Sequence, residues 1–134
     1  MCDMTDVRRP YIRMAKDAFK IVKEVGLTLP DLEAAVRYDG SPVLKLDGVL
    51  VAGLASHSSA ERDSLVVRVG LEERELLLED APDIYYVTDY YRPYPIVLVR
   101  LSRIDREALH DLLSVSRRLA LEKTRKLAGS SDPA

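Results

Sequence analysis

The chain has 134 residues, of which 47% are apolar and 31% charged, and its formal net charge is −2. These values predict one globular domain, large enough to fold without a disulfide framework or a structural metal. A single cysteine excludes an internal disulfide, and no apolar run reaches the roughly 20 residues that span a bilayer. Residues 1–6 lack the charge and hydropathy pattern of a secretion signal, so we expect a cytoplasmic protein without a membrane partner.

The first predicted element is a helix within residues 5–25, followed by Gly26 as its stop. Apolar residues recur there at spacings of three and four, which is typical of a helix with one buried side. They are Tyr11, Ile12, Ala15, Ala18, Phe19 and Val22. Pro10 suits the first turn of this helix, and the regular helix begins either before Pro10 or at it.

Residues 27–101 contain short apolar runs bounded by Gly, Pro, Asp and Ser, which predict a sheet. The strongest local signal is Asp47-Gly48, because a type I′ turn needs positive φ at both positions. It predicts a tight antiparallel hairpin. The predicted strands are Ala35–Tyr38, Val43–Leu46, Val49–Leu54, Ser64–Val69, Ile84–Val87 and Ile96–Leu101.

Two further helices are predicted. A short amphipathic helix covers Glu72–Glu79 and should bury Leu71, Leu76 and either Leu77 or Leu78. Asp105 is the expected N-cap of a last helix that runs to about Leu127 and stops at Gly129. Its inner side is formed by Leu109, Leu112, Leu113, Ser116, Leu119 and Ala120.

This order of elements predicts an α+β fold. We expect a mainly antiparallel twisted sheet with the N-terminal and C-terminal helices packed on one of its faces. Residues 1–129 would form a single domain, and residues 130–134 a frayed tail.

The sequence favours no catalytic chemistry. His57 and His110 are its two histidines, and no spacing typical of a metal site or of a phosphate-binding glycine loop occurs. His57 is interpreted as a loop residue and His110 as a residue on a helix surface. We therefore expect neither an enzyme nor a bound metal or cofactor.

Basic residues gather on the outer sides of the two long helices. On the first helix they occupy a band roughly 80° wide, opposite the apolar side. Such bands can attract a phosphate backbone, although a solvated helix surface also needs charge of some kind. The candidate residues are Arg9, Arg13, Lys16, Lys20 and Lys23 on the first helix, and Arg117 and Arg118 on the last.

A second candidate region is the stretch 84–96, which contains five of the seven tyrosines. Tyrosine and arginine provide rigid amphipathic surface and can stack on exposed bases. Strand alternation turns either Tyr85 or Tyr86 toward the core. The remaining residues Tyr91, Arg92 and Tyr94 are candidates for binding. The alternative is that some of these rings fill the core beneath the turn.

A third candidate region is the sheet face opposite the helices. Lys45, Arg68 and Arg100 interrupt apolar strands, and alternation places each of them on that face. Apolar residues of the same strands accompany them there. A partly apolar open face could bind a ligand, a partner protein or a second copy.

Several segments resemble the MmcQ/YjbR family of small bacterial proteins. The likeness is carried by Leu29-Pro30, Glu33, Tyr38, Gly40, Pro42, Lys45, Gly48, Glu72-Glu73-Arg74-Glu75, Tyr86-Val87-Thr88, Tyr91-Arg92, Tyr94-Pro95 and Val97-Leu98-Val99-Arg100-Leu101. This resemblance implies a frataxin-type α+β sandwich, also described as double-wing, and a DNA-binding role. The chain departs from the family at Tyr90, Pro93 and Ile96, where histidine, glycine and tryptophan are usual.

Two functional hypotheses follow. The first is a non-catalytic DNA-binding domain that uses the basic helix surfaces and the tyrosine-rich turn. The second is a module that binds a protein or a small ligand, or a homodimer, through the open sheet face and the same turn. The first predicts binding that weakens steeply with salt, and the second predicts salt-tolerant association.

Overall fold

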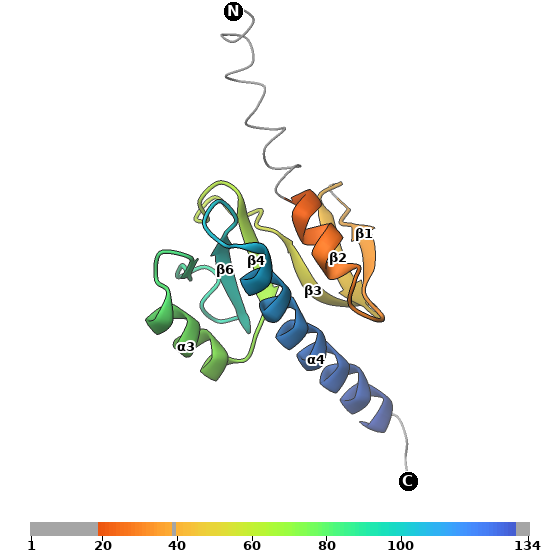
Figure 1. Cartoon of the computed structure of the whole chain (residues 1–134). Coiled ribbons are helices and arrows are strands. Elements are labelled where there is room, and N and C mark those ends of the chain that lie inside the picture. Colours follow the sequence, from red (N-terminus) through yellow and green to blue (C-terminus); the bar gives the residue numbers. More distant parts are fainter. Residues whose placement is uncertain (1–18, 39, 131–134) are drawn as a thin grey trace, which may run out of the picture.

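The computed structural model describes residues 19–38 and 40–130, which form an α+β fold built on a six-stranded antiparallel sheet (Figure 1). The strand order is β1-β2-β3-β4-β6-β5. The strands are β1 Glu33–Val36, β2 Pro42–Leu46, β3 Val49–Leu54, β4 Ser64–Arg68, β5 Tyr85–Tyr86 and β6 Ile96–Arg100. The helical segments are residues 19–26, α3 Leu71–Asp80 and α4 Arg106–Ser130. No helix in the described part of the chain is long and apolar enough to cross a membrane.

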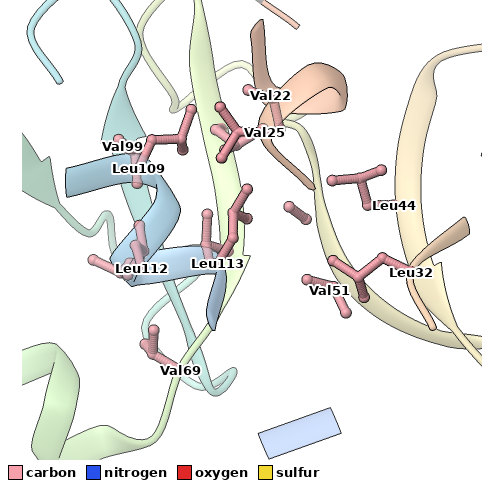
Figure 2. Packing of buried hydrophobic residues seen from close by; sticks show 14 of the residues in the cluster. Val22, Val25, Leu32, Leu44, Val51, Val69, Val99, Leu109, Leu112 and Leu113 are labelled. Carbon is pink, nitrogen blue, oxygen red and sulfur yellow. The ribbon is translucent and has the colours of Figure 1, made fainter. Parts of the chain in front are cut away.

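Helix 19–26 and α4 cover the same face of the sheet, as the sequence predicts (Figure 1). Their apolar sides meet the inward residues of the strands in one continuous core, part of which Figure 2 shows. Val22 and Val25 come from the first helix, and Leu109 and Leu113 from α4. In the same core the hydroxyl of Ser116 donates to the Val51 carbonyl at 3.1 Å. The predicted inner side of α4 is confirmed except at Leu119, which is half-buried.

The hairpin of β2 and β3 is confirmed with its turn. Asp47 and Gly48 have φ values of 47° and 80°, as a type I′ turn requires. The register shifts at Leu44 and Lys45, which pair with Ala52 and Leu50 and leave Val51 as an extra residue. This bulge lets both Val51 and Ala52 contribute to the main core.

Several element bounds differ from the prediction. Strand β1 lies two residues earlier than expected, because the chain turns after Val36: Arg37 and Ser41 are bridged by a backbone hydrogen bond of 2.8 Å, and Gly40 has φ of 87°. Strand β5 is shorter than the expected Ile84–Val87. Residues 5–18 of the predicted first helix, with Pro10, lie outside the described residues, and the helical segment ends at Gly26.

Helix α4 begins as predicted and ends later. The Asp105 carboxylate accepts the Ala108 backbone N–H at 2.7 Å, which caps the first turn. The helix continues through Gly129 to Ser130. Glycine lowers helix propensity without forbidding helical φ and ψ, so Gly129 does not stop the helix and Ser130 does not belong to a tail.

Helix α3 is present, and the prediction of its buried side is confirmed at Leu77 and Leu78 but wrong at Leu71 and Leu76. Leu71 and Leu76 are 57% and 66% exposed. The side that faces the sheet instead contains Arg74, which is buried, and Leu77 and Leu78, which are half-buried. Positions 74, 77 and 78 follow the helical spacing, so one charged residue occupies a core position that the leucines were expected to fill.

Candidate functional site

The face of the sheet opposite the helices carries basic side chains near its centre. Lys45 on β2 pairs directly with Leu50 on β3, and Arg68 on β4 donates from Nε to the Leu50 carbonyl at 2.7 Å. Lys45 and Arg68 therefore flank Leu50 from two strands that are separated by one strand, which places their backbones about 10 Å apart. The alternation prediction for both residues is confirmed.

A third basic side chain reaches the same face from beyond β1. Arg37 donates from Nη1 to the Leu54 carbonyl at 2.8 Å and to the Ser41 hydroxyl at 3.4 Å. Its guanidinium lies over Gly53, where an added Cβ would be 2.8 Å from Nη2. A glycine in the middle of β3 thus provides the space for Arg37. The sequence analysis missed Arg37, and the glycine within a predicted strand was the available signal.

Arg37, Lys45 and Arg68 together form what we call the cationic face. None of the three forms an ion pair with a carboxylate among residues 19–38 and 40–130. Glu33 lies opposite Lys45 on β1 and is exposed. Burial lowers the pKa of the Arg68 guanidinium, because the charged form has lost part of its hydration. An anion bound here would compensate for that loss.

Residues 87–95, which we call the tyrosine loop, cover the adjoining part of this face. Tyr91 is 8% exposed and packs with Val66, Ile96 and Leu98 in a second apolar cluster. Its hydroxyl accepts the backbone N–H of His57 at 3.1 Å. The prediction of Tyr91 as a binding residue is corrected, because its ring fills the space beneath the loop.

Two other tyrosines of the loop are exposed. Tyr90 stacks on His57, with ring centroids 3.5 Å apart and an interplanar angle of 8°. Tyr90 and Tyr94 are 49% and 51% exposed, and their centroids lie 6.3 Å apart. Arg92 is also exposed and lies 3.6 Å from the Asp89 carboxylate. The loop therefore offers two aromatic rings and one cation to solvent.

Arg74 of α3 fixes the end of the tyrosine loop. Its buried side chain donates from Nη1 to the carbonyls of Tyr94 and Ile96 at 3.0 and 3.2 Å. Its buried Nε has no hydrogen-bond partner among the described residues. Sequence reasoning missed this role, because Arg74 is surrounded by glutamates in a segment typical of a solvated helix surface.

Arg100 lies on the open face as predicted, but internal contacts occupy it. It forms a bidentate ion pair with Glu61, from Nε to Oε1 at 2.9 Å and from Nη2 to Oε2 at 2.7 Å. Its Cζ lies 4.3 Å from the centre of the Tyr86 ring. It also donates to the carbonyls of Pro82 and Asp83. The hydrogen bond from Arg100 lowers the pKa of the Glu61 carboxyl. We therefore revise Arg100 from a candidate binding residue to a structural one.

The side chains of Tyr85 and Tyr86 lie on opposite faces of the sheet, as strand alternation requires. Tyr85 is buried in the main core, whereas Tyr86 is half-buried and packs against the second cluster. The Tyr86 hydroxyl accepts the Glu61 backbone N–H at 2.7 Å. Tyr86 therefore joins the segment before β4 to β5 and helps to hold the loops of the open face together.

Those candidate basic residues of the helices that the structure describes lie on the other side of the sheet from the cationic face. Lys20, Lys23 and Arg118 are exposed there. Arg117 donates to the Pro30 carbonyl at 2.7 Å and forms an ion pair with Asp31 at 3.3 Å. The predicted Arg9, Arg13 and Lys16 lie outside the described residues. The described helix cations and the tyrosine loop therefore do not form one continuous surface.

The two histidines have local contacts. His57 Nδ1 lies 2.8 Å from the Ser59 hydroxyl, and His110 on α4 lies 3.7 Å from the Asp111 carboxylate. In the described part of the chain no three His, Cys, Asp or Glu side chains gather in a way that could hold a metal ion. The chemistry that the open face offers is recognition of an anion beside exposed aromatic rings.

Comparisons with models of protein families and with curated proteins find no match to this chain.

Proposed function

We propose that the chain is a non-catalytic domain of the MmcQ/YjbR type that binds DNA in the cytoplasm through the open face of its sheet. The observation that carries this proposal is the position of three basic residues, which form no ion pair within residues 19–38 and 40–130, on the sheet face that the tyrosine loop with its two exposed rings adjoins. This proposal moves the phosphate-binding role from the helix surfaces to Arg37, Lys45 and Arg68. It needs no cofactor.

The two parts of the surface have different roles in this proposal. The cationic face contacts phosphate groups, which contributes affinity that falls as salt rises. Tyr90 and Tyr94 stack on bases, an interaction that contributes about 1–3 kcal/mol per base. Arg74 and His57 hold the loop in place, so little conformational freedom would be lost on binding.

Exposed rings on an open sheet favour unpaired bases. In a duplex the faces of the bases are already stacked on one another, so a protein ring must displace a neighbouring base to reach them. We therefore expect single-stranded DNA to bind more tightly than a duplex of the same sequence.

Fluorescence anisotropy of labelled DNA, titrated with the full chain at about 50 and 200 mM salt, tests the proposal. Lys45→Ala should weaken binding roughly threefold to tenfold, whereas Lys23→Ala, which removes the same charge from the helix side, should leave it unchanged. Tyr94→Ala should weaken binding of the single strand at least about fivefold, and Tyr94→Phe should retain it.

Three results would overturn the proposal. Absence of binding at low salt removes the nucleic-acid role altogether. Equal losses for the Lys45 and Lys23 variants assign the affinity to overall charge rather than to the cationic face. Binding that is unchanged in Tyr94→Ala removes the stacking role of the loop.

A further inference from the structure

We propose that the groove between α3 and α4 is a second binding site, which takes a basic amphipathic helix of a partner protein. The groove has a volume of about 600 Å³. It lies on the helix side of the sheet, away from the cationic face, where α3 and α4 are visible in Figure 1. Its apolar lining comes from Val69, Leu76, Leu77, Tyr85, Leu112 and Val115.

Leu76 is an apolar residue of this groove whose side chain is exposed to solvent. It lines the groove and is nevertheless 66% exposed, although a leucine gains from burial. Leu71 on the same helix is similarly exposed but does not line the groove. A partner that enters the groove would remove Leu76 from water and would leave Leu71 as it is.

Every charged side chain that lines the groove is a carboxylate: Glu73, Glu79, Asp80 and Asp111. Within the described residues, the first three form no ion pair, and the contact of Asp111 with His110 is ionic only when the ring is protonated. Burial and the nearby carboxylates raise the pKa of the Tyr85 hydroxyl at the apolar floor. The groove thus combines an apolar floor with a negative rim.

This combination selects the chemistry of the occupant. The carboxylates favour a partner with Lys or Arg and oppose a nucleic acid, whose charge has the same sign. A helix with apolar residues at positions i, i+3, i+4 and i+7 fits a groove that two helices flank. Lysines on either side of that apolar stripe would lie close to the carboxylates of the rim. The basic part of α4 in a second copy fits less well, because every exposed position from Arg118 to Lys126 is charged and none of them is apolar.

The test uses the full chain and two labelled peptides of about 14 residues, a length that can form a helix on binding. One peptide has leucines at the stripe positions and lysines elsewhere, and the other has glutamates in place of the lysines. Anisotropy titrations should show binding of the lysine peptide and at least about tenfold weaker binding of the glutamate peptide.

Matched variants locate the site. Leu76→Lys should weaken binding of the lysine peptide at least about tenfold, whereas Leu71→Lys, the same change outside the groove, should stay within about twofold. Asp80→Lys should weaken it about fivefold, whereas Glu75→Lys, on the same helix but outside the groove, should have little effect.

Four results would overturn the inference. They are absence of binding of the lysine peptide, equal binding of both peptides, equal losses in the groove variants and their controls, and self-association in sedimentation that Leu76→Lys abolishes. The last would assign the groove to a second copy. Because Leu76→Lys leaves the cationic face unchanged, its DNA binding should equal that of the wild type, so this inference and the proposed function fail independently.

Discussion

The two faces of the sheet are stabilised in different ways. On the helix side, helix 19–26 and α4 cover one large core that consists almost entirely of aliphatic residues. On the open side, a small cluster around Tyr91 is accompanied by polar contacts, from Arg100 to Glu61 and from the His57 backbone N–H to the Tyr91 hydroxyl.

This difference shows how a polar residue in an apolar strand should be interpreted. Lys45, Arg68 and Arg100 share the same face, but Arg100 has a carboxylate and two carbonyls as partners, whereas Lys45 forms no ion pair within residues 19–38 and 40–130. A charged residue on an open sheet face is therefore a candidate for binding only when no carboxylate within the fold already pairs with it.

The largest effect is expected on the helix side. Leu113→Ala should lower the free energy of unfolding by about 3–4 kcal/mol, because Leu113 is fully buried between α4 and the sheet. Chemical denaturation measures this loss. A loss below about 1 kcal/mol would contradict the view that this core carries most of the stability.

Arg74→Met tests the polar contact by which α3 holds the end of the tyrosine loop. It keeps the apolar stem and removes the donor to the Tyr94 and Ile96 carbonyls, so we expect a loss of about 1–2 kcal/mol. Amide hydrogen exchange should also become faster in the tyrosine loop. A more stable variant would mean that burial of this guanidinium costs more than its hydrogen bonds contribute.

Tyr91→Phe tests a single contact of the second cluster. It keeps the ring and removes the hydroxyl that accepts the His57 N–H, so stability should fall by about 1 kcal/mol. Tyr90→Phe is the matched control, since that ring is half exposed and stacks on the same histidine. Thermal denaturation that gives equal shifts for both variants would remove the structural role of the Tyr91 hydroxyl.

Glu61→Gln should have the smallest effect, and its effect should depend on pH. The folded pKa of Glu61 is lowered, so the pair with Arg100 contributes above the ordinary carboxyl value near 4.5 and is lost as the pH falls through the lower folded value. Because Glu61 is largely exposed, we expect a difference below about 1 kcal/mol at pH 7. Urea titrations should show this difference shrinking below about pH 4, and a difference that grows there would contradict the assignment.

Local patterns predicted those features that depend on neighbouring residues. The Asp47-Gly48 turn, the Asp105 cap and the alternation that places Lys45 and Arg68 on one face all depend on a few consecutive positions. The inner side of α4 follows from its spacing. These features are set by backbone geometry that the residue types themselves restrict.

The errors concern contacts between distant segments. Arg100 meets Glu61 across 39 residues, and Arg74 meets Ile96 across 22. In α3 the leucines predicted a buried side that includes Leu71 and Leu76, whereas the structure buries Arg74, which donates to carbonyls about 20 residues further along the chain. Spacing along the chain contains no information on such distant partners, so the roles of Arg37, Arg74 and Arg100 became evident only in the folded structure.

The two edge strands of the sheet are short, which affects the tendency of this protein to associate edge to edge at high concentration. β5 has two residues, and β1 has four and begins with the charged Glu33. A neighbouring chain that added itself as a further strand would find few free N–H and C=O groups at either border. The sheet therefore resists edge-to-edge growth into fibrils, even though its strands consist largely of valine and leucine.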